Sequence, residues 1–113
     1  MHKITFLIGL IWICFSCAKD KVPAIIDPNC VEEVSFANDI WPIIEQNCTG
    51  CHGVGNSTGY VFTNHTNVSF NANAIIGSMR NEGFQLMPIG GPALPDSLIQ
   101  KVSCWINQGS KNN

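Results

Sequence analysis

The sequence has no hydrophobic run long enough to cross a membrane. The apolar stretch from Ile4 to Phe15 is shorter than the roughly 20 apolar residues that a membrane-spanning helix needs. Lys3 precedes this stretch, and the polar residues AKDKVP follow it abruptly after Ser16 and Cys17. The pattern is typical of a secretory signal peptide over residues 1–16, with a short membrane anchor or an N-terminal core helix as the alternatives.

The chain is also poor in basic residues. It has 6 Lys and Arg against 8 Asp and Glu, and removal of the signal with Lys3 leaves five bases against eight acids. This balance argues against a nucleic-acid-binding protein, which would show a basic surface, and no basic block suits anionic lipid. No activated nucleophile, acid–base pair, phosphate-binding loop or internal repeat is visible, so we expect no enzyme activity. A chain of 113 residues holds one small domain at most.

The residues around the predicted cleavage site are similar to a bacterial lipoprotein signal. Ser16 precedes Cys17, and Asp20 follows soon after, although Cys14 and Phe15 are not the commonest residues there. The similarity implies lipidation of Cys17, export to the periplasmic side of a bacterial membrane, and membrane contact through the N-terminal lipid. Residues 17–33 are then a tether and leading segment, in which prolines discourage helix.

Helical periodicity appears in three places after residue 33. Apolar residues recur at helical spacing before the cysteine pair, at Phe36, Ile40, Ile43, Ile44 and Cys48. A short helix is expected within NANAIIGSMRNEG, and the strongest helical pattern runs from about Asp96 to Gln108. The remaining chain is rich in Gly, Asn and Pro. This predicts an all-α domain over residues 34–113 whose few helices leave its centre to be filled by something else.

The stretch NCTGCHG contains two cysteines three apart and a histidine directly after the second. On a helical turn, Cys48 and Cys51 share one face and can reach the two vinyl groups of a porphyrin. His52 can then place its ring under the iron, and the spacing matches covalent attachment of one haem c. The alternatives are structural zinc, a thioredoxin-like redox pair and a plain Cys48–Cys51 disulfide. A structural zinc site would need a second, closely spaced pair of ligands, and a thioredoxin-like pair would need a βαβ pattern. The sequence shows neither.

The sixth position of such an iron has three candidate ligands downstream. Met87 precedes a proline in QLMPIGGP, a loop able to hold a side chain over the haem. Met79 lies on a predicted helix, where methionine is more often a filler of the core. His65 lies in a polar loop, where solvent exposure is the plain interpretation. We therefore expect His52 and Met87 as the metal ligands.

The segments FANDIWPIIEQNCTGCHG, LMP and LIQKVSCWINQG together resemble a small monohaem c-type cytochrome domain, class I-like, as found in bacterial secreted and lipoprotein chains. The resemblance covers about residues 34 to 109. It implies a cytochrome c-like fold of three to four helices around one covalent haem, with long Gly/Asn-rich loops. It further implies that the first helix crosses the last, with Phe36 or Ile40 near Trp105. The Asn-rich insert around His65 departs from the pattern.

Two cysteines remain outside this pattern, Cys30 and Cys104. On a helical wheel Cys104 falls off the apolar stripe of its helix, near Gln100 and Asn107. An off-stripe cysteine in an oxidising compartment pairs where it can, and Cys30 is the partner left. We predict a Cys30–Cys104 disulfide, with two free thiols or pairing with another chain as the alternatives.

These features predict an electron carrier with a His/Met-ligated haem, tethered as a lipoprotein and exchanging electrons with redox protein partners. The first alternative is a five-coordinate haem protein, with Met87 absent or labile, that binds a gas or peroxide. The second alternative is a non-haem, disulfide-stapled binding module.

Overall fold

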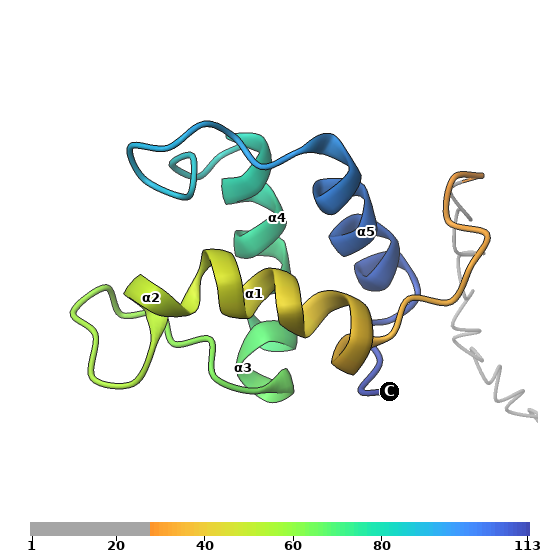
Figure 1. Ribbon diagram of the computed structural model, residues 1–113, viewed down its shortest axis with the longest axis horizontal. Helices are drawn as coiled ribbons and strands as arrows, with labels where there is room; N and C mark the ends of the chain where they lie inside the picture. Colours follow the sequence, from red (N-terminus) through yellow and green to blue (C-terminus); the bar gives the residue numbers. More distant parts are fainter. Residues whose placement is uncertain (1–27) are drawn as a thin grey trace, which may run out of the picture.

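The computed structural model describes residues 28–113, and these residues form an all-helical fold (Figure 1). No strand occurs within this part of the chain, which confirms the all-α prediction. The elements are η1 (Phe36–Ile40), α1 (Trp41–Asn47), α2 (Thr49–His52), α3 (His65–Phe70), α4 (Ala72–Arg80) and α5 (Asp96–Asn107). The predicted signal peptide 1–16 and the lipidation site Cys17 lie outside the described residues. No helix within residues 28–113 is long and apolar enough to cross a membrane.

The first helical run is divided into η1, α1 and α2. Ser35 begins it with a reciprocal cap: its Oγ accepts from the Asn38 amide at 3.2 Å, and Asp39 Oδ2 accepts from the Ser35 amide at 3.0 Å. Pro42 falls in the first turn of α1, directly after the π-helical turn η1. Cys48, at φ −122°, interrupts the run between α1 and α2. The single helix expected from the apolar stripe is thus three short elements.

The core lies where α5 packs against η1 and α4. Its largest fully buried side chains are Trp105, Ile40, Ile44, Val68 and Val102. The ring centroids of Phe36 and Trp105 are 5.6 Å apart, which confirms the expected contact between the first and last helical regions. Asn64 caps α3 by accepting from the Asn67 amide at 2.9 Å, so the Asn-rich insert contains a helix that the sequence did not predict.

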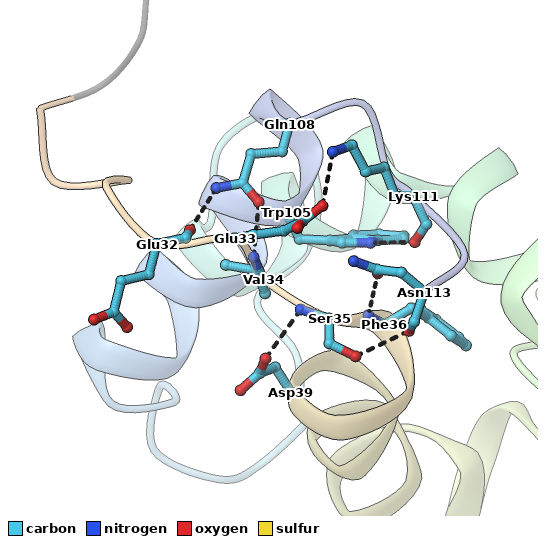
Figure 2. A network of polar contacts seen from close by, with 10 residues as sticks. All are labelled: Glu32, Glu33, Val34, Ser35, Phe36, Asp39, Trp105, Gln108, Lys111 and Asn113. Carbon is cyan, nitrogen blue, oxygen red and sulfur yellow. Dashed lines mark hydrogen bonds and ion pairs between the residues drawn. The ribbon is translucent and has the colours of Figure 1, made fainter.

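The C-terminal residues close over the start of η1 (Figure 2). The Phe36 amide donates to Asn113 Oδ1 at 2.9 Å, and Ser35 Oγ donates to the Asn113 main-chain oxygen at 2.9 Å. Trp105 Nε1 donates to the Lys111 carbonyl at 2.9 Å, which satisfies the one polar atom of this buried indole. These bonds hold the C-terminal segment against the core.

The leading segment is attached to the same end of the molecule. Gln108 bridges it through both ends of its amide: it accepts from the Val34 amide at 2.8 Å and donates to the Glu32 carbonyl at 2.7 Å. A disulfide joins Cys30 to Cys104, with Cα atoms 5.2 Å apart, and this confirms the predicted pairing. Cys104 is buried although it lies off the apolar stripe, because the leading segment covers it.

Candidate functional site

A cavity of about 480 Å³ lies between α2, α4 and the loop that follows α4. This volume is within the range of small-molecule pockets, roughly 300–1,000 Å³. None of the lining residues is Asp, Glu, Lys or Arg, and most are apolar or aromatic. They are Asn47, Cys48, Cys51, His52, Thr58, Tyr60, Phe62, Ile75, Ser78, Met79, Met87, Pro88, Ile89 and Leu94.

The short helix α2 and the residue that caps its start, Cys48, place the cysteines and the histidine at the cavity wall. The His52 and Cys51 amides donate to the Cys48 carbonyl at 2.9 and 3.2 Å, so the three residues share one helical turn. The chain then returns past His52, and the Phe62 amide donates to the His52 carbonyl at 2.8 Å. This return brings the aromatic pair Tyr60 and Phe62 to the cavity wall.

The ring of His52 is oriented by its neighbours. Its Nδ1 atom lies 3.2 Å from the Tyr60 carbonyl oxygen and 3.0 Å from Thr58 Oγ1. The Phe62 ring lies alongside, with centroids 4.9 Å apart. A carbonyl at Nδ1 favours a proton there, which leaves Nε2 as the basic ring nitrogen. His52 is one of the residues that line the cavity.

The two thiols of the motif differ in environment, and neither is part of a disulfide. Cys48 is half-buried, and burial raises the pKa of its thiol to about 11. Cys51 is exposed. The Cys48–Cys51 disulfide considered as an alternative is therefore not formed.

Met87 lines the cavity from the loop that follows α4. Its amide donates to the Ser78 carbonyl on α4 at 3.1 Å, which fixes the loop against that helix. Met79, also on α4, is 3% exposed and lines the same cavity. The structure thus brings together Cys48, Cys51, His52 and Met87, the four residues that the sequence predicts as the site.

His65 lies elsewhere. Its Nε2 is 2.7 Å from the Ser110 carbonyl oxygen, and its ring meets Phe36 edge to face with centroids 4.9 Å apart. Because these contacts fix the ring in the packing around Trp105, His65 is not freely exposed. It lines a separate hollow with Phe36 and Trp41, and not the cavity that contains Met87. Sequence reasoning missed Tyr60, Phe62 and Ile75 as cavity residues. For Tyr60 and Phe62, the available signal was the pair of aromatic residues one residue apart in the stretch YVF.

Comparisons of the sequence with family models and curated proteins, and of the fold with solved structures, found no match.

The predicted cofactor, one covalent haem c, is corrected by the structure. Among residues 28–113 no group of three or more His, Cys, Asp or Glu side chains comes together that could hold a metal ion. Cys48, Cys51 and His52 are close in the chain, but Cys48 lies half-buried in the wall while Cys51 is exposed. The motif specifies only the spacing of residues along the chain, whereas metal binding requires side chains that converge in space. On this finding the haem prediction is wrong.

Proposed function

We propose that this chain is a small exported binding module whose cavity holds a largely apolar, redox-active ligand, and that it works as an electron carrier. The observation that supports binding is the uncharged cavity of about 480 Å³ with two thiols, a positioned imidazole and two thioethers on its walls. Apolar walls with a few convergent polar groups are typical of cofactor and small-molecule sites. The electron-carrier part rests on the sequence resemblance described above.

The thiol pair itself is a poor candidate for the redox group. Thiol–disulfide exchange requires a thiolate, and the raised pKa of Cys48, about 11, keeps that thiol protonated near neutral pH. Reactive pairs of this kind lie in electropositive surroundings that lower a cysteine pKa. The cavity around Cys48 has no Lys or Arg in its lining. A bound ligand is therefore the better carrier of the electron.

The proposal includes a cytochrome c-like arrangement of the helices. It is supported by the way η1 meets α5, with Phe36 against Trp105, and by the shared cavity that α2 and the Met87 loop line. It also includes lipid attachment at Cys17 and redox protein partners that exchange electrons with the ligand. Lipid attachment is tested by Cys17→Ser, which should leave precursor or release soluble protein while the cavity is unchanged.

The test is a visible spectrum of the full chain, purified after export and recorded with and without dithionite, beside a mass spectrum under non-denaturing conditions. We expect a bound small molecule whose absorption changes on reduction. Protein that binds nothing and absorbs only in the ultraviolet would refute the proposal. A bound molecule without redox response would leave only the disulfide-stapled binding module. A haem spectrum would contradict the finding that residues 28–113 contain no metal-binding group of His, Cys, Asp or Glu side chains.

Two histidine variants make a matched pair for this test. His52→Ala removes a nitrogen at the cavity wall and should weaken ligand retention at least about tenfold, which corresponds to about 1.4 kcal/mol. His65→Ala removes the same side chain from a packing site outside the cavity, so it should retain the ligand while lowering stability. Equal ligand retention by the two variants would contradict the assignment of the cavity as the binding site.

A further inference from the structure

The C-terminal end of α4 turns back on itself directly beside the cavity. Asn81 ends the helix in the left-handed conformation, at φ 57°. The Glu82 amide then donates to the Gly77 carbonyl at 2.8 Å, a bond that closes the last turn of the helix. The chain therefore reverses within a few residues and runs back along α4 toward Met87.

Gly77 is the residue of α4 against which this returning chain packs. A Cβ atom placed on Gly77 would lie 2.5 Å from Cδ2 of Phe84 and 2.9 Å from the Glu82 carbonyl oxygen. Both distances are shorter than real Cβ contacts, so any residue other than glycine would displace the ring, the carbonyl or both. The Phe84 ring thus occupies the space that a side chain at position 77 would take.

Glycine at this position contradicts the local preference of the helix. In the interior of a helix, glycine is less favourable than alanine, because it loses more conformational freedom on folding. Gly77 is buried and lies within the nine-residue helix α4, three residues before its end. A glycine inside a helical pattern usually has a packing or functional reason, and here the close approach of Phe84 supplies it.

The contact between Gly77 and Phe84 is connected to the cavity by a short path. Ser78, the next residue of α4, accepts the Met87 amide at 3.1 Å, three residues beyond Phe84. Ser78, Met87 and Pro88 all line the cavity. A displacement of Phe84 therefore acts on the hydrogen bond that places Met87.

We propose that Gly77 is a positioning residue for the binding cavity: its missing side chain lets Phe84 pack on α4, and this contact sets the position of Met87 on the cavity wall. This inference rests on the proposed function, because Gly77 positions a wall of the same proposed binding site. Gly77 touches no ligand in this scheme and acts only through Phe84 and the Met87 loop.

The test is amide hydrogen exchange on the full chain for wild type, Gly77→Ala and Phe84→Ala, read residue by residue. We expect the Met87 amide to exchange at least about tenfold faster in both variants, because local opening controls exchange of such a bond. The Phe62 amide, bonded to the His52 carbonyl on the other wall, should keep its wild-type rate. Phe70→Ala is the matched control, since that ring on α3 is 87% exposed and should alter neither amide.

An unchanged exchange rate of the Met87 amide in Gly77→Ala would overturn the positioning role. Equal acceleration of the Met87 and Phe62 amides would overturn it as well, because it would indicate a general loss of stability. If Gly77→Ala does not fold, Phe84→Ala against Phe70→Ala decides the question alone. Because amide exchange needs no ligand, the two proposals fail separately. Faster Met87 exchange in a protein that binds nothing supports the positioning role and refutes the proposed function.

Discussion

Reduction of the Cys30–Cys104 disulfide should remove a large part of the stability of this domain. The bond links residues 74 apart in sequence and so encloses almost the whole described fold. In the chain-entropy description, a cross-link across a loop of this length restricts the unfolded state by about 4.5 kcal/mol at 25 °C. Small domains have total unfolding free energies of only about 5–15 kcal/mol. The reduced protein should therefore be close to the limit of stability.

The assay is urea unfolding of the full chain with and without dithiothreitol, followed by tryptophan fluorescence. We expect a lower midpoint on reduction and a loss of about 3–4.5 kcal/mol in the free energy of unfolding. A Cys30→Ala/Cys104→Ala variant should match the reduced wild type and show no response to dithiothreitol. Cys48 and Cys51 are free thiols and add no such response of their own. A loss below about 1 kcal/mol would refute the reasoning.

The native contacts of the leading segment provide a second check on this mechanism. If the disulfide acts mainly through the unfolded chain, the hydrogen bond from the Val34 amide to Gln108 persists in the reduced folded state. That amide should then stay protected under conditions where the reduced protein is still folded. Early loss of protection at Val34 alone would show that the disulfide acts by holding the leading segment in place.

Three further outcomes are expected. Ile44→Ala should lower the free energy of unfolding by about 2–5 kcal/mol in a denaturant titration, because Ile44 is fully buried. The hydrogen bond from Lys101, and then the one from the Ser35 amide, lower the pKa of Asp39. The Asp39 carboxylate therefore stabilises the fold fully above the ordinary Asp pKa of about 3.9, and this stabilisation is lost as the pH falls through the lowered pKa. Asp39→Asn should flatten this acid limb of a pH–stability curve, and an unchanged limb would contradict the assignment. Iodoacetamide at pH 8 should modify Cys51 well before Cys48, since Cys48 has a pKa of about 11; equal rates by mass spectrometry would contradict its burial.

Features with a local signal were predictable from the sequence. The apolar stripe indicated the buried face of η1 and α1, and the pattern at Leu98, Val102 and Trp105 predicted α5 almost to its ends. The disulfide followed from the number of cysteines left over. The four predicted cavity residues do line one cavity, although the metal centre expected from them is corrected.

Features that depend on distant contacts were not predictable. The Gln108 bridge to Glu32 and Val34 spans more than 70 residues of chain, and no local pattern indicates it. Asn64 caps α3 in a segment without apolar periodicity, so the helix was not expected. The contact of Phe84 with Gly77 is formed by a reversal of the chain, and the sequence shows only a glycine inside a helix.

The disulfide also has a mechanical consequence. A pulling force on the leading segment is transmitted through the Cys30–Cys104 disulfide to α5, next to the fully buried Trp105. The cavity elements α2 and the loop after α4 lie at the other end of the molecule in Figure 1, away from that path. Tension from any membrane attachment upstream would therefore be taken up by a covalent bond and the core helix. The α4 wall of the cavity packs against that core helix, so only the walls on α2 and on the loop after α4 lie apart from the path.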